Sequence, residues 1–190
     1  MPLTPFNVAG ILTQQLVVTG NIGVSVPQLA LGVANGLCLW TSGTLLVATV
    51  DTGTLGAGVG AFPCVIPPPL LFAGLTLGFA SAGLVGISVP SLLAGLTSGL
   101  ALAFPTGVIT TVHPAVSTGV ATVTFPGPSS VPSMLTGFAS AGMVGSNNAQ
   151  LATGIGLGLD FSFASFTIPI PIVGPTTPSA GGGVGYGKIV

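Results

Sequence analysis

The chain has 190 residues, of which only 2% are charged, compared with about 25% in an ordinary soluble domain. The charged residues are Asp51, Asp160 and Lys188, which give a net charge of −1, and the one histidine is His113. Nucleic-acid binding is excluded because neutralising phosphates takes several Lys or Arg side chains. So few titratable groups also argue against acid–base catalysis and against a calcium cage.

The chain is strongly apolar, with a hydrophobic fraction of 49% and a mean hydropathy of +1.00. Disorder is excluded, because disordered chains combine low hydrophobicity with high net charge. Residues 70–104 are apolar enough to span a membrane twice, but membrane proteins fix their orientation with Lys and Arg in loops, and here only Lys188 is available. A surface with so few charges does little to keep copies apart, so we expect the protein to live inside an assembly.

The first predicted elements are a tight turn and a short helix. Gly20 and Gly23 predict the turn, because glycine accepts a positive φ. Ser25 then predicts the cap of a helix of about ten residues, which carries Gly32 and Gly36 on one face. Glycines four residues apart allow close backbone contact with another helix.

The segments that follow the helices predict β-structure. The helix is expected to be followed by a strand-like run at 37–40, and two further helices, described below with the repeat, by runs at 100–104 and 159–163. Runs of β-branched residues predict further strands at 44–50, 108–112 and 120–125. Ile168–Ile172 alternates Ile with Pro, which predicts an edge strand or an extended segment. The glycine-rich tail, residues 176–190, is too rich in glycine to fold on its own.

The turn and helix recur twice more, which makes an internal repeat the strongest signal in the sequence. Windows 20–40, 83–103 and 142–162 align without a gap, Ser88 takes the place of Ser25 in the second, and Asn147 and Asn148 supply the capping chemistry in the third. The aligned columns are Gly20, Gly83 and Gly142; Gly23, Gly86 and Gly145; Gly32, Gly95 and Gly154; Gly36, Gly99 and Gly158; Leu29, Leu92 and Leu151; and Leu37, Leu100 and Leu159.

These patterns predict a mainly β fold with short helices (α+β), in which three internal repeats have pseudo-threefold symmetry. A single triplicated domain is expected over 1–175, with repeat cores at about 16–50, 78–125 and 137–173.

No residue pattern predicts a metal, a cofactor or a catalytic site. His113 has no second histidine, and zinc needs three or four ligands. Cys38 and Cys64 either form one disulfide or, as we prefer, are two buried thiols. We therefore expect no enzymatic activity.

Over residues 16–175, the triplication and the charge-poor, Gly- and Pro-rich, β-forming composition resemble in architecture the PAAR-repeat proteins, which sharpen the spikes of contractile phage tails and type VI secretion systems. This resemblance implies a spike tip that docks on a trimeric partner. PAAR tips bind a metal through several His and a Cys, whereas this chain has one His, so no metal is carried over.

The expected function is therefore a structural component of a phage tail or baseplate, a spike tip or hub protein that docks on a homotrimeric spike and aids envelope penetration. It would be made in the host cytoplasm and reside in the virion, with transient membrane contact and no nucleic acid among its partners. One alternative is a small multi-pass membrane protein whose helices pack through Gly-x-x-x-Gly. Another is a secreted surface-adhesive or ice-binding protein.

Overall fold

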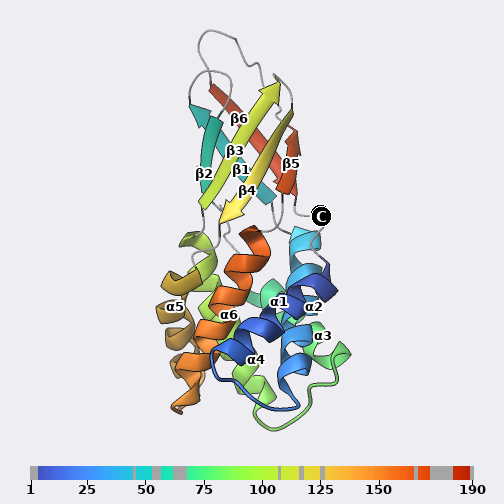
Figure 1. Ribbon diagram of the computed structural model, residues 1–190, viewed down its shortest axis with the longest axis vertical. Helices are drawn as coiled ribbons and strands as arrows, with labels where there is room; N and C mark the ends of the chain where they lie inside the picture. The colour runs from blue at the N-terminus through green and yellow to red at the C-terminus, as the bar shows by residue number, and fades with distance from the viewer. Residues whose placement is uncertain are drawn as a thin grey trace.

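The computed structural model describes residues 4–44, 46–52, 57–61, 68–106, 108–115, 118–124, 127–164, 167–171 and 182–188, with side chains described for 4–39, 69–105 and 130–164. Six helices form one half of the molecule and six strands the other (Figure 1). The helices are α1 (Pro5–Val18), α2 (Val26–Thr44), α3 (Pro68–Ser81), α4 (Val89–Ala103), α5 (Gly127–Ser140) and α6 (Asn147–Ala164), and a 3-10 turn (Phe104–Thr106) follows α4. The strands are β1 (Leu46–Thr52), β2 (Ala57–Ala61), β3 (Val108–Ala115), β4 (Thr118–Thr124), β5 (Thr167–Pro171) and β6 (Gly182–Lys188).

The prediction of a mainly β fold with short helices (α+β) is wrong. Of the residues whose side chains are described, 81% are helical and none lies in a strand, so this body is all-helical. The runs at 37–40 and 159–163, expected to be strands, lie in α2 and α6 instead. The run at 100–104 lies in α4 as far as Ala103, and Phe104 begins the 3-10 turn. Their Leu, Ala and Phe side chains suit either structure, and burial between helices decides for the helix.

The unit that repeats is a helical hairpin. Each aligned window begins in a turn and continues into α2, α4 or α6, and a helix of 14 residues precedes each turn. Those preceding helices, α1, α3 and α5, were not predicted. Thr4 begins α1 by accepting a hydrogen bond from the Asn7 amide at 3.4 Å, next to Pro5. Ser88, predicted to cap α4, makes no side-chain capping bond.

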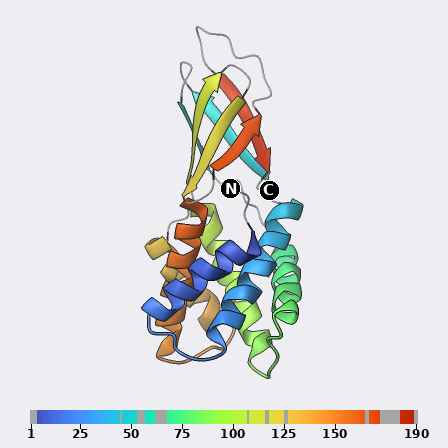
Figure 2. The same ribbon diagram turned by 45° about the vertical axis from the view of Figure 1, so that its right-hand side comes forward.

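The helices close into a ring in which each second helix packs on the next hairpin. The three between-hairpin contacts are α2 with α3, α4 with α5, and α6 with α1 (Figure 2). Gly36 lies so close to α3 that an added Cβ would be 2.6 Å from the Leu75 Cα, and an added Cβ on Gly99 would be 2.7 Å from the Met134 Cα. In the closing contact, an added Cβ on Gly158 would lie 3.1 Å from the Leu12 Cα.

The backbone approach is two-sided in the first two contacts. Gly78 of α3 faces the Gly32 carbonyl and the Gly36 amide, and Gly137 of α5 faces Gly95 and Gly99 in the same way. The corresponding place on α1, five residues before the turn glycine, is occupied by Gln15. The contact of α6 with α1 is thus glycine-lined on one side only.

The core lies inside the helical ring. Its largest fully buried side chains are Phe79, Phe104, Phe138, Leu12, Leu16, Leu37, Leu71, Leu75, Leu96 and Leu100. Near the sheet, Phe104 and Phe163 meet edge to face, with ring centroids 5.9 Å apart and planes at 89°. Two buried hydroxyls donate within their own helices: Thr97 to Leu93 O at 2.7 Å and Ser162 to Gly158 O at 2.6 Å.

The strands form one antiparallel sheet in the order β5-β4-β3-β2-β1-β6. β1 and β2 leave the ring between α2 and α3, β3 and β4 between α4 and α5, and β5 and β6 follow α6. β5, which contains Pro169 and Pro171, is an end strand of this order, as the missing proline amides require. β6 lies in the glycine-rich tail and pairs with β1, for example Tyr186 opposite Ala48, and β5 and β6 also lie in contact.

Replacing Gly99 with Leu is expected to lower the free energy of unfolding by about 3 kcal/mol, because the added side chain must displace the α5 backbone. Gly10 provides the matched control, since it lies within α1 and a Cβ there would meet nothing within 4 Å. Gly10→Leu should stabilise the protein by up to about 1 kcal/mol through helix propensity. Chemical denaturation measures both, and equal effects at the two positions would contradict the packing described.

Candidate interaction surface

Each hairpin turn ends its first helix with the same pair of backbone hydrogen bonds. In the first turn the Gly20 amide donates to Val17 O at 3.0 Å and the Asn21 amide to Leu16 O at 2.9 Å, which is the Schellman arrangement. The second and third turns repeat both bonds, from Gly83 and Leu84 and from Gly142 and Met143. Gly20, Gly83 and Gly142 have φ values of 90°, 71° and 72°, a region that L side chains avoid.

The turns expose apolar side chains almost completely. Two residues beyond each Schellman glycine stand Ile22, Val85 and Val144, exposed by 90%, 87% and 93%. Two residues further on, Val24 is 94% exposed and Ile87 is 99% exposed, while the third turn has Ser146 there. We call Ile22, Val24, Val85, Ile87 and Val144 the tip surface. All three turns lie at the end of the ring away from the sheet (Figures 1 and 2).

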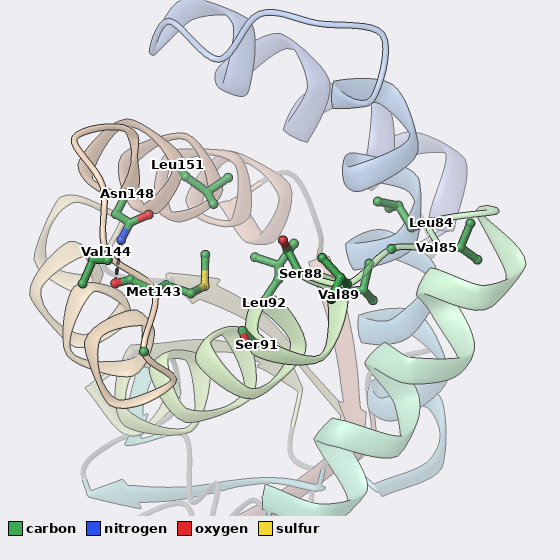
Figure 3. Close-up of a pocket in the computed structure, with 13 residues that line it drawn as sticks. Leu84, Val85, Ser88, Val89, Ser91, Leu92, Met143, Val144, Asn148 and Leu151 are labelled. Atoms are coloured by element: carbon green, nitrogen blue, oxygen red, sulfur yellow. Dashed lines mark hydrogen bonds between the residues drawn. The ribbon is translucent and has the colours of Figure 1, made fainter.

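A depression of about 650 Å³ lies between the second and third turns (Figure 3). Leu92 of α4, Leu151 of α6 and Met143 of the third turn line it, together with Ser88, Ser91 and Asn148. Asn148 Nδ2 donates to Met143 O at 3.0 Å, which fixes the start of α6 against the turn. Val85 and Val144 lie at opposite sides of the depression. The lining is mostly apolar and contains no charged residue.

The eighteen repeat positions singled out in the sequence fall into three structural groups. The turns contain Gly20, Gly23, Gly83, Gly86, Gly142 and Gly145; the contacts between hairpins contain Gly32, Gly36, Gly95, Gly99, Gly154 and Gly158; and the core contains Leu37, Leu100 and Leu159, with Leu29, Leu92 and Leu151 packed against it. These positions therefore build the ring. The side chains of the tip surface were not singled out, although Ile22, Val85 and Val144 each stand between two turn glycines in the sequence.

The titratable residues do not converge on a site in the described part of the chain. Asp160 lies on α6 and is partly exposed. Asp51 lies in β1, His113 in β3 and Lys188 in β6, but their side chains, like all of Cys64, lie outside the described residues. Among the residues searched, no group of three His, Cys, Asp or Glu side chains could hold a metal. The absence of a metal or cofactor stays a prediction.

Cys38 of α2 is buried, and burial raises the pKa of its thiol to about 11. A neutral thiol at physiological pH is a poor nucleophile and metal ligand. Cys38 therefore contributes packing rather than chemistry.

No protein-family model matches the chain, and neither a curated protein nor a solved structure matches it with significance. A search of the described helices found none that is long and apolar enough to cross a membrane.

The raised pKa of Cys38 makes stability depend on pH in the alkaline range. The unfolded thiol titrates near its ordinary pKa of 9.0 and the folded one near 11, so the stabilisation is complete below pH 9 and is lost as the pH rises toward 11. Denaturation of the parent chain should show this loss. In Cys38→Ala, the free energy of unfolding should no longer fall between pH 9 and pH 11. Cys64→Ala serves as the comparison. An unchanged slope in Cys38→Ala would contradict the assignment.

Proposed function

We propose that the chain is a non-enzymatic structural component of a phage contractile tail or baseplate, a spike tip or hub protein that docks as a single copy on a trimeric partner. The observation that supports this most is the threefold repetition of the same helix contact around a closed ring. A monomer with three like units offers each subunit of a trimer nearly the same surface.

The repetition extends from the contacts to the turns. Gly32, Gly95 and Gly154 face Phe79, Phe138 and Leu16, which occupy matching places on α3, α5 and α1. The Schellman bonds recur in all three turns. The glycine contacts between hairpins and the Schellman bonds of the turns thus recur, while most of the side chains differ. This pattern is what we expect if the protein needs three similar faces.

The scarcity of charge supports an internal position in an assembly. Within the described side chains of 4–39, 69–105 and 130–164, Asp160 is the one charged residue. Contacts with a partner would then consist of apolar packing and hydrogen bonds rather than ion pairs. The PAAR resemblance, by contrast, loses the part that depended on β-forming composition, because the repeating hairpin is helical. The proposal depends on the triplication and the composition alone.

The copy number in the native particle tests the proposal. Cryo-electron microscopy should place one copy on a threefold axis, because the chain already supplies three similar faces. Three, six or many copies away from the axis would contradict it. Washing particles at high salt should not release the protein, since charge-steered complexes weaken with ionic strength and this one has few charges to screen. Release by salt would indicate docking through ion pairs instead.

A further inference from the structure

We propose that the tip surface is a lipid-contact site, which inserts its aliphatic side chains shallowly into the interface of a zwitterionic bilayer. This deepens the proposed function, since it names which end of the spike tip would meet an envelope and what it would recognise there. The test below needs no particle, so it can fail without affecting the copy-number test.

The three turns expose the same kind of side chain. The repeats have diverged at many positions, but Ile22, Val85 and Val144 are all β-branched aliphatic residues and all stand at least 87% exposed. Such exposed side chains add little to folding, because they bury almost no area within the chain. Their cost is a tendency to associate. Recurrence of the same costly feature in three turns indicates a contact outside the chain.

The turns contain neither charged nor aromatic residues. The described turns carry no Asp, Glu, Lys or Arg, and Asp160 lies on the last turns of α6, toward the sheet. Insertion of the tip surface would therefore bring no ionised group toward hydrocarbon, where a charge is expensive. The tip surface contains Ile and Val alone. Insertion of Ile and Val into hydrocarbon is favourable on membrane-insertion scales, so lipid matches this composition.

The position of the turns and their backbone hydrogen bonds also suit insertion into a membrane interface. The three turns lie at one end of the ring, so one plane can receive all of them (Figure 2). Each turn satisfies part of its backbone internally: the carbonyls of Gly23, Gly86 and Gly145 accept hydrogen bonds from Val26, Val89 and Asn148. Satisfied backbone groups lower the penalty of leaving water. The hairpin turns are too short to span a bilayer. We expect them to insert to about 5–10 Å, the depth of interfacial segments.

Flotation with vesicles tests the assignment. The full-length protein should float with phosphatidylcholine–phosphatidylethanolamine vesicles, equally at low and high salt, because the tips carry no cation to attract anionic headgroups. The triple variant Ile22→Ser, Val85→Ser, Val144→Ser should bind about tenfold or more weakly, because it loses three aliphatic insertions. Its helical circular dichroism should match the parent, since the replaced side chains are exposed.

A matched variant distinguishes binding through the tip surface from nonspecific hydrophobic adsorption. Phe6, Leu70 and Leu102 are also exposed, by 84%, 46% and 52%, but lie near the sheet end of α1, α3 and α4. Replacing these three with Ser should leave flotation unchanged. As a second readout, brominated phosphatidylcholine should quench the added fluorescence of Val85→Trp but not that of Phe6→Trp.

Three outcomes would overturn the proposal. The parent chain fails to float, both triple variants lose binding equally, or the tip variant floats as well as the parent. If the parent ignores vesicles while the tip variant no longer assembles into particles, the tip surface is a seat for a protein, which also overturns lipid contact. That result would leave single-copy docking intact.

Discussion

The ring of six described helices depends on the close approach of helix backbones between neighbouring hairpins. Each approach occurs where α2, α4 or α6 carries two glycines four residues apart. Three such approaches link the hairpins, and each places a glycine against the backbone or a core side chain of the next hairpin. Glycine lowers intrinsic helix stability by up to about 1 kcal/mol per site, so packing must offset it. The close approach adds dispersion contacts along both helices. An added Cβ would hold the two helices apart and remove these contacts. A Cβ at these glycines would therefore have to displace the neighbouring helix.

The sequence predicted the elements that depend on a specific backbone requirement. The turn glycines, the helix-facing glycines and the core leucines recur in three ungapped windows, so their columns were visible, and each column has one structural role. The strands near 44–50, 108–112, 120–125 and 168–172 were also placed close to their observed positions, because β-branched residues and prolines mark them. The predicted pseudo-threefold symmetry implies a closed arrangement, but the pairing of α6 with α1, which joins residues more than a hundred positions apart, was not predicted.

The helices α1, α3 and α5 were missed for a physical reason. A helix is recognised by contrast between an apolar face and a charged one, and these helices have no charged residue to mark the solvent side. Phe72 and Leu77 of α3 are exposed while Leu71 and Leu75 are buried, so apolar residues lie on both sides of the helix. The tip surface escaped notice for the same reason, because Ile22 and Val85 look like core residues until burial is known. Their exposure is a property of the fold.

Ring closure has a consequence for how the protein forms during synthesis. The partner of α1 is the last helix of the ring, so the first hairpin remains incomplete until nearly the whole chain has left the ribosome. Until then the side of α1 that packs on α6, with Leu12 and Leu16, lacks that partner and has α2 alone beside it. Contacts between distant segments slow folding, and uncovered apolar surface favours aggregation in the interval. A nascent chain with almost no charge to repel its neighbours is therefore a strong candidate for chaperone protection.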